Sequence, residues 1–146
     1  MSLLDAAEAA HYRARTKAFL ERWRDATARW EKQAAPLKGV PVVAYHKNLS
    51  YLFDWLGMRE TGALEPKPGL PPSTAHLSAL LEQLKRDPAK AVVRAAYNEP
   101  RAADWLAERA GVPSVMLPYT VGGTDRAKDL FGLYEDTIAR LMQVTQ

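Results

Sequence analysis

Short apolar runs alternate along this chain with longer segments in which apolar residues recur every three or four positions. The apolar runs cover residues 40–45, 91–96 and 113–117, and residues 58–64 are a further candidate for a short strand. The periodic segments cover residues 4–34, 49–57, 74–87, 101–110 and 130–141. Runs of the first kind predict buried strands, and the second spacing predicts amphipathic helices. Strands alternating with helices predict a three-layer α/β domain with a roughly four-stranded parallel sheet and a long N-terminal helix.

The N-terminal helix predicted over residues 4–34 is unusually long for a small domain. Its apolar stripe has steps of three or four residues and comprises Tyr12, Thr16, Phe19, Trp23, Ala26 and Trp30. At about 1.5 Å per residue the helix would be roughly 45 Å long. One interpretation is a helix that packs along one side of the core, and we expect Phe19, Trp23 and Trp30 to be buried in some way.

Glycine, proline and serine mark where these elements end. Gly57 and Gly111 follow helical segments as C-terminal caps do, Pro100 suits a first helical position, and Ser73 is a favourable N-cap. Residues 65–72 contain four prolines and are predicted to be a loop. That loop is either a stiff spacer or a rigid surface for a partner.

The candidate chemistry lies where the predicted strands end. His46 follows the first strand, Asn98 and Glu99 follow the 91–96 strand, and the loop 119–125 follows the last one. Ligand sites of parallel sheets lie beyond the carboxyl ends of the strands, so we expect His46 to be partly exposed there, near Glu99 and that loop. A histidine with oxygen donors suits Zn²⁺ or Mn²⁺. Alternatively, Glu99 stabilises a helix N-terminus, and Asp125 or Thr124 caps the final helix.

The run from Val42 to Met58, VVAYHKNLSYLFDWLGM, resembles the zinc/manganese substrate-binding proteins of bacterial ABC importers. In that family a strand ends in a metal-binding His or Glu, and an aromatic-rich helix ending in Gly follows. The family has two lobes joined by one long helix, with the metal between them. The resemblance implies that residues 1–36 are the interlobe helix and 37–146 the C-terminal lobe. It implies capture of zinc or manganese for a membrane permease by a full-length protein that is periplasmic or anchored at the cell surface, with the N-terminal lobe missing here.

The resemblance also implies a set of metal ligands. His46 falls on the family's ligand position, while Glu99 matches a glutamate that supports the ligands. The family's aspartate ligand comes from the loop after the last strand, where this chain has Thr120. Asp125 is close enough to replace it. The predicted metal residues are therefore His46, Asp125 and Glu99, with two more histidines expected from the other lobe, and the metal itself is not specified.

The composition of the chain excludes several kinds of partner and ligand. The net charge is +3, and Lys and Arg are interspersed with acidic residues, so we expect no nucleic-acid partner. The chain has no cysteine, which excludes thiolate ligands and disulfides. Residues 1–20 lack the apolar segment of a signal peptide, so we expect a piece of a longer exported protein.

The sequence also bears on three other classes of function. The sequence contains no catalytic motif, since Ser50 and Ser114 are not in a G-x-S-x-G elbow. We therefore expect that the protein is not an enzyme. Gly122 and Gly123 precede a helix and could cradle a phosphate or nucleotide, but the lysine of a P-loop is absent. An interaction module without metal would use the long helix. An apolar stripe left uncovered on that helix would favour a homodimer.

Overall fold

The computed structural model describes residues 5–67 and 69–145. The chain forms two compact units, Met1–Gln33 and Ala34–Gln146. The functional division of the chain into an interlobe helix, 1–36, and a lobe, 37–146, stays a prediction. Among the described residues, no helix combines the length and the apolar character needed to cross a membrane.

The first unit consists mainly of one helix, α1, which spans Ala9–Ala34. The prediction that the helix begins at residue 4 is wrong for residues 5–8, which form irregular and turn structure; Leu4 lies outside the described residues. The reason is local, because the carboxylate of Asp5 accepts a hydrogen bond from the backbone N–H of Glu8 at 3.3 Å. Asp side chains stabilise such turns in competition with the helix.

The aromatic stripe of α1 is buried unevenly. Trp30 is only 1% exposed, whereas Phe19 is 41% exposed and stacks on Trp23 with ring centroids 5.8 Å apart. The expectation that Phe19 is buried is therefore wrong for this structure. The next residue, Leu20, is also exposed, at 42%.

Self-association through α1 stays a prediction, with Phe19 and Leu20 as its centre. Replacing both residues with serine is expected to shift the chain from dimer to monomer, because exposed apolar side chains favour association. Sedimentation velocity at tens of micromolar measures this. Replacing Lys17 and Glu21, which form an exposed ion pair on the same helix, is the control. A wild-type chain that sediments as a monomer would contradict the prediction.

The second unit contains a four-stranded sheet. Its strands are β1 Pro41–Ala44, β2 Arg59–Ala63, β3 Ala91–Ala95 and β4 Ser114–Leu117. They run in the order β2-β1-β3-β4, and every neighbouring pair is parallel. The predicted four-stranded parallel sheet is confirmed, including the candidate strand at 58–64.

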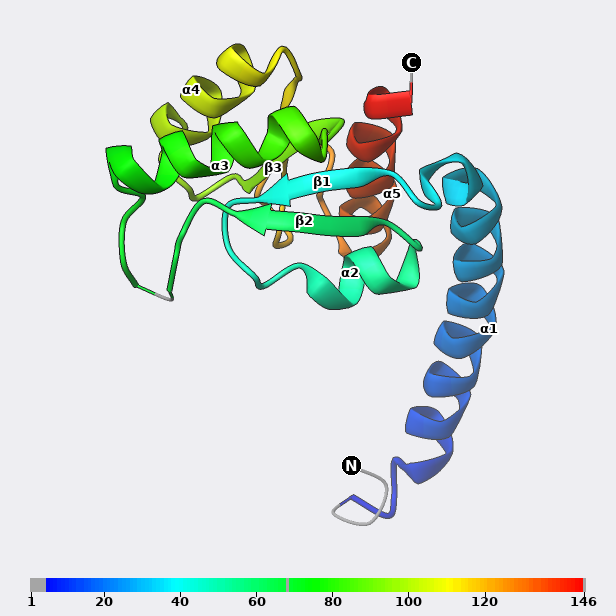
Figure 1. Ribbon diagram of the computed structural model, residues 1–146. Coiled ribbons are helices and arrows are strands. Elements are labelled where there is room, and N and C mark those ends of the chain that lie inside the picture. The colour runs from blue at the N-terminus through cyan, green and yellow to red at the C-terminus, as the bar shows by residue number, and fades with distance from the viewer. Residues whose placement is uncertain (1–4, 68, 146) are drawn as a thin grey trace. The chain divides into compact units, whose positions relative to one another are not determined.

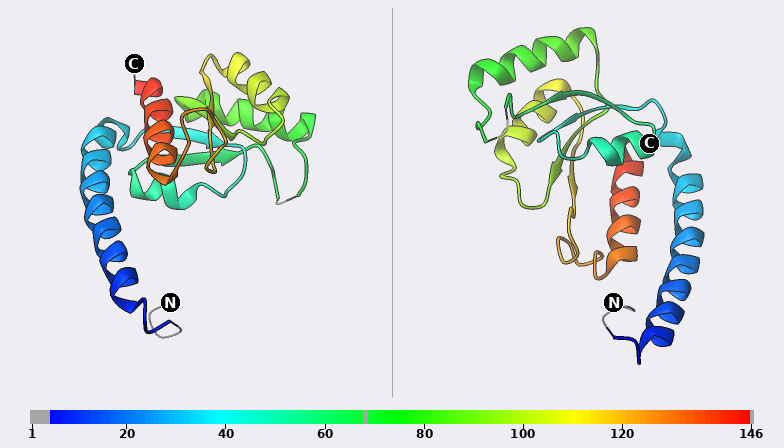
Figure 2. Two further views of the ribbon diagram at one scale, coloured as in Figure 1. Left: turned by 180° about the vertical axis from the view of Figure 1, so that it is seen from behind. Right: turned by 90° about the horizontal axis from the view of Figure 1, so that it is seen from below.

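Helices cover both faces of the sheet. They are α2 Ser50–Trp55, α3 Thr74–Arg86, α4 Arg101–Ala110 and α5 Leu130–Leu141, with short 3-10 turns at Ala35–Leu37 and Met142–Thr145. Figures 1 and 2 show α3 and α4 on one face and α2 and α5 on the other. The predicted three-layer α/β class is therefore confirmed.

The core follows the alternation of side chains along the strands. One cluster lies between the sheet and the α3–α4 layer: Val43, Leu64, Leu77, Leu80, Leu84, Ala89, Val92, Ala103, Leu106 and Ala107. Val43 pairs with Val92 across β1 and β3, while Ala44 and Val93 pair on the opposite face. The central strand β1 is covered on both faces and is apolar throughout, whereas the edge strand β2, with the sequence RETGA, carries polar and charged residues.

The predicted helix ends are largely as observed. The Ser73 side chain accepts a hydrogen bond from the backbone N–H of His76 at 3.2 Å, so its capping role is confirmed. Gly111 follows α4 with φ of 68°, and Gly57 follows α2 with φ of 67°. Both are in the left-handed region, where glycine carries no Cβ penalty. Pro100 is the N-cap of α4, one residue before the predicted position.

Candidate metal-binding site

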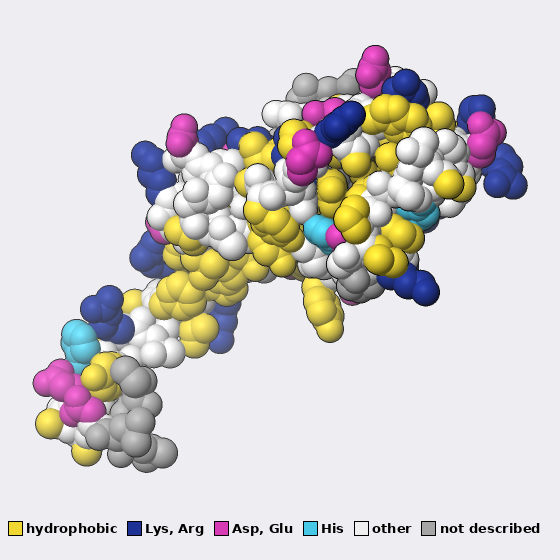
Figure 3. Space-filling view, turned by 90° about the vertical axis from the view of Figure 1, so that its left-hand side faces the viewer, with side chains coloured by type: hydrophobic (Ala, Val, Ile, Leu, Met, Phe, Trp, Pro, Cys, Tyr) yellow, Lys and Arg dark blue, Asp and Glu magenta, His cyan; other side chains and the backbone are white. Residues whose placement is uncertain are grey.

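His46 lies just beyond the carboxyl end of β1, between the ends of β2 and β3. The backbone places it there: Tyr45 donates to the carbonyl of Val93 at 2.7 Å and accepts from the N–H of Glu65 at 3.1 Å. Since β1 is a central strand, its tip is flanked by the tips of both neighbours. Figure 3 views this edge of the sheet, where histidine and acidic side chains lie among hydrophobic ones. The predicted position of His46 at the carboxyl edge is confirmed.

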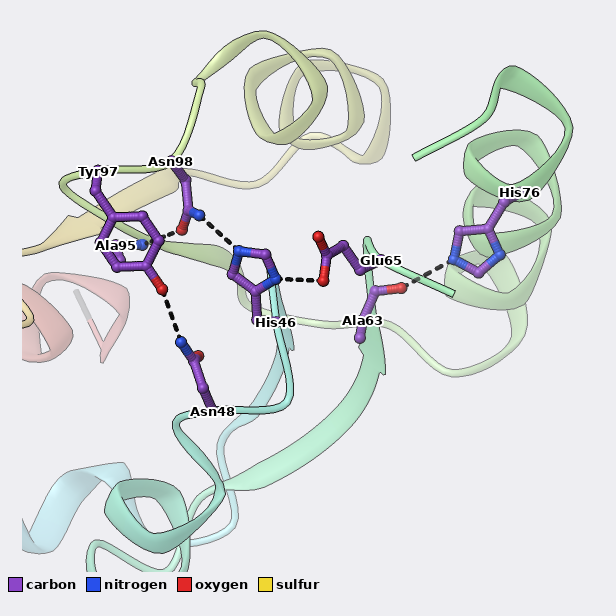
Figure 4. Close-up of polar contacts among 8 residues, drawn as sticks. All are labelled: His46, Asn48, Ala63, Glu65, His76, Ala95, Tyr97 and Asn98. Carbon is purple, nitrogen blue, oxygen red and sulfur yellow. Dashed lines mark hydrogen bonds and ion pairs between the residues drawn. The ribbon is translucent and has the colours of Figure 1, made fainter. Parts of the chain in front are cut away.

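Both ring nitrogens of His46 have a partner (Figure 4). Nδ1 lies 2.5 Å from Oε2 of Glu65, and Nε2 lies 2.7 Å from Nδ2 of Asn98. The side chains of His46 and Glu65 are 24% and 15% exposed, so His46 is partly exposed as predicted. Asn98 is buried. The imidazole is therefore held between a carboxylate and an amide, with a restricted opening to solvent.

Tyrosines form the wall beside His46. Tyr97 lies nearly parallel to the imidazole, with ring centroids 6.2 Å apart, and Tyr119 meets Tyr97 edge-on at 5.2 Å. Asn48 donates to the Tyr97 hydroxyl at 2.9 Å. Burial, more than any charge, raises the pKa of both Tyr45 and Tyr97. These tyrosines therefore stay protonated at neutral pH and are uncharged hydrogen-bonding groups at the site.

A cleft of about 700 Å³ opens over this group and is lined by His46, Lys47, Asn48, Glu65, Pro66, Lys67, Gly69 and Tyr97. Its walls combine one imidazole, one carboxylate and two lysines. A cation could approach the imidazole and the carboxylate, whereas the lysines would attract an anion. The cleft is wide for a bare metal ion.

Glu99 turns towards helix α4. Its Oε2 accepts a hydrogen bond from the backbone N–H of Arg101, the first residue of that helix, at 3.1 Å. Glu99 also lines a separate cavity with Tyr45 and Trp105, and its negative charge contributes to the raised pKa of Tyr45, after burial. This geometry fits the helix-terminus interpretation of Glu99.

The loop that carries Asp125 is tied to α5 by its neighbour. Thr124 donates to Oδ2 of the buried Asp136 at 2.6 Å, while Asp125 is exposed. The N-cap of α5 is Asp129, whose Oδ1 accepts from the N–H of Gly132 at 2.8 Å. The expectation that Asp125 or Thr124 caps the final helix is therefore wrong. The helix starts later than such a cap requires, and Asp129 is the acceptor next to its first turn.

Gly122 and Gly123 make this loop tight rather than free. Gly122 has φ of 83°, and its N–H donates to the carbonyl of Ala127 at 2.7 Å. A Cβ on Gly123 would lie 2.0 Å from the carbonyl oxygen of Pro118. The two glycines therefore allow a closely packed turn and do not leave the loop free to move.

Gly123→Ala is expected to destabilise the fold by about 3 kcal/mol, the upper end for overpacking, because the backbone at Pro118 has to move. Gly122→Ala is the matched control. It has open space around its Cβ and a positive φ, so it should cost only about 1 kcal/mol of backbone strain. Urea denaturation of both variants measures the difference. Equal losses would contradict the steric argument.

Two residues that contact His46 were not predicted as site residues. Glu65 was predicted only as part of the proline-rich loop, and Glu99 rather than Asn98 was predicted as a metal residue. A signal existed for Glu65: it stands two residues beyond the end of β2, as His46 stands two residues beyond the end of β1. Parallel strands bring equivalent positions to one edge.

The other histidine of this unit is tied to the backbone. Nε2 of His76 lies 2.9 Å from the carbonyl oxygen of Ala63 (Figure 4), and the residue is half-buried. His76, in the first turn of α3, is therefore not a fully solvated helix-end histidine. Throughout residues 5–67 and 69–145, no three His, Cys, Asp or Glu side chains are placed together so as to hold a metal ion.

Solved structures with the same fold are numerous. One is a crystal structure of ZnuA, with a TM-score of 0.76 and 15% identity, matched over 99% of this chain and 52% of that one. Another is FpvC from Pseudomonas aeruginosa in complex with Mn²⁺, at 0.74 and 24%, matched over 99% and 56%. A third is a manganese-bound mutant of the periplasmic metal-binding protein from Candidatus Liberibacter asiaticus, at 0.77 and 15%, also matched over 99% and 56%. The chain thus spans just over half the length of these proteins.

Sequence comparison places the chain in a family. A search of curated protein sequences found no match. The profile of the family described as ZnuA, zinc-uptake complex component A, periplasmic, matches residues 1–144. Because this match covers nearly the whole chain and the fold agrees, the chain belongs to the ZnuA family of periplasmic zinc-uptake components.

Proposed function

We propose that this chain is the metal-binding C-terminal lobe of a solute-binding protein that captures a divalent metal ion in the periplasm for an ABC importer. The observation that carries the proposal is His46, which lies at the carboxyl edge of the sheet, partly exposed, with a carboxylate at Nδ1. Imidazole is a ligand for zinc and other transition metals, and a carboxylate hydrogen-bonded to its second nitrogen is the usual support. Membership of the ZnuA family supports the same function.

The proposed mechanism is coordination rather than catalysis. His46 contributes one nitrogen ligand, and the N-terminal lobe contributes the others when the two lobes close around the ion. The membrane permease then receives it. Asp125 and Glu99 stay predictions as oxygen ligands. Zinc and manganese are both candidates as the transported ion; the similar structures bind Mn²⁺, Ni²⁺ or Cd²⁺.

The chain alone is expected to bind Zn²⁺ weakly. A zinc site uses four protein ligands or three with water, whereas no such set is grouped in the described residues. Isothermal titration of the isolated chain should therefore give a dissociation constant far above that of the two-lobed protein. Nanomolar binding by the isolated chain would contradict the prediction that the second lobe is required.

The same titration separates metal capture from nucleotide or phosphate binding. ATP is titrated in parallel with Zn²⁺, and His46→Ala serves as the control for both. Loss of the Zn²⁺ signal in this variant, without any heat from ATP, supports the proposed function. Saturable ATP binding that survives the replacement of His46 would favour the phosphate-binding alternative.

A further inference from the structure

The hydrogen bonds around His46 define which ring nitrogen carries the proton. The side chain of Asn98 is oriented by the backbone, because its Oδ1 accepts from the N–H of Ala95 at 2.8 Å. An amide has one oxygen and one NH₂ group. With Oδ1 committed to Ala95, Nδ2 is a donor, and the atom it faces at 2.7 Å, Nε2 of His46, has to accept.

The other ring nitrogen follows from this assignment. Nε2 presents its lone pair to Asn98, so the ring proton is on Nδ1, which donates to Oε2 of Glu65 at 2.5 Å. Figure 4 shows this chain of contacts from Ala95 through Asn98 and His46 to Glu65. The lone pair on Nε2 is the electron pair that a metal ion would use. In this structure that lone pair accepts the hydrogen bond from Nδ2 of Asn98.

We propose that Asn98 is a positioning residue for His46: its Nδ2–H holds the Nε2 lone pair and releases it to the incoming metal ion, while Glu65 keeps the proton on Nδ1. This inference rests on the proposed function of His46 as a ligand. Metal binding then requires Nε2 of His46 and Nδ2 of Asn98 to move apart, which subtracts this one hydrogen bond from the gross binding energy, while Oδ1 of Asn98 stays bonded to the N–H of Ala95. Glu65 stays in place and increases the electron density on the ring.

His76 provides an internal reference in the same molecule. Its Nε2 faces the carbonyl oxygen of Ala63 at 2.9 Å, and a carbonyl only accepts, so His76 carries its proton on Nε2. The two histidines are therefore expected in opposite tautomers. Long-range proton–nitrogen correlation NMR of the labelled chain distinguishes them without any metal. A proton on Nε2 of His46 would overturn the inference whatever the metal does.

Adding Zn²⁺ tests the second part of the proposal, in which the Nε2 lone pair of His46 is released to the metal ion. The His46 Nε2 resonance is expected to respond to the metal while the His76 resonances do not, and this is measurable even for weak binding. A response only at Nδ1 of His46 would overturn the inference. If no nitrogen of His46 responds at saturating Zn²⁺, the proposed function fails, and with it the release step, while the tautomer is still decided by the metal-free spectrum.

Two variants separate the roles of the partners. Asn98→Ala is expected to tighten Zn²⁺ binding by about two-fold to ten-fold, the equivalent of one net hydrogen bond, because the competing donor is gone. Glu65→Gln keeps an acceptor for Nδ1–H but removes the charge, and should weaken binding by about 10–100-fold. Unchanged His76 resonances show that each variant is folded. Weaker or equal binding by Asn98→Ala would overturn the release step.

Discussion

His46→Ala is expected to weaken Zn²⁺ binding by the two-lobed protein by about 100-fold or more. Replacing a residue that only supports a ligand already costs about 10–100-fold, and His46 is the one predicted nitrogen ligand of this lobe. The imidazole also fills the space between Glu65 and Asn98, which both contact it. Removing it leaves the cleft with a carboxylate and no imidazole nitrogen to coordinate a metal ion. Isothermal titration of the variant against the wild type measures the change.

The matched control is His76→Ala. That histidine lies in the same unit, and its Nε2 is engaged by the carbonyl of Ala63, so its loss should leave the affinity unchanged. A comparable loss of affinity in both variants would mean that the effect is on folding and would contradict the role given to His46.

Asp125→Ala, measured beside them, tests the remaining ligand prediction. As a ligand, Asp125 would cost about as much affinity as His46 when replaced. As a surface carboxylate on a loop fixed through Thr124, it would leave both affinity and melting unchanged, because the cap of α5 is Asp129. Unchanged affinity would remove Asp125 from the site.

Asp136→Ala is expected to lower the free energy of unfolding by about 3 kcal/mol or more. The side chain of Asp136 is only 2% exposed, and its Oδ2 accepts from Arg140 Nε at 2.9 Å and from Thr124 Oγ1 at 2.6 Å. Alanine removes both hydrogen bonds; a net hydrogen bond contributes about 1 kcal/mol and one to a charged group about 1.5–3 kcal/mol, so the two losses together reach about 3 kcal/mol. Urea denaturation provides the measurement.

Asp87→Ala is the control for this effect. Asp87 forms a bidentate pair with Arg59, but both side chains are about half exposed. Exposed pairs contribute little to stability, so the loss should be far smaller than for Asp136. Similar losses in the two variants would contradict the importance assigned to burial.

The contribution of Asp136 should also depend on pH. Burial raises the pKa of this carboxyl, but hydrogen bonds from Thr124 and Arg140 and the charges of Arg140 and Arg126 outweigh it, so the pKa lies below its ordinary value. A group with a lowered folded-state pKa contributes its full stability above the unfolded pKa of about 3.9. That contribution is lost as the pH falls through the folded pKa.

Asp136→Asn should therefore lack this part of the acid dependence. Below about pH 4 the wild type should lose stability more steeply than the variant. Parallel slopes in urea titrations over that range would contradict the proposed hydrogen-bonded carboxylate.

The sequence alone determined the order and type of nearly every element. Mostly apolar runs predicted β1, β3 and β4, because strands that are covered on both faces have no solvent-facing polar side. Ser73, Gly57 and Gly111 marked helix ends because caps depend on residues a few positions apart. The same local logic placed His46 at a strand tip, and hence at the carboxyl edge of the sheet.

Only the tertiary structure decided which groups surround His46. Glu65 and Asn98 are 19 and 52 residues away along the chain, and they reach it because β2 and β3 flank β1 in the sheet. The strand order decides which strand ends are neighbours. It is set by the packing of whole layers and cannot be predicted from local periodicity. The same holds for Asp136, whose partner Thr124 is 12 residues away. The Thr124 hydroxyl is engaged by the buried carboxylate of Asp136, so it does not cap α5, and this hydrogen bond holds the loop before α5 in place.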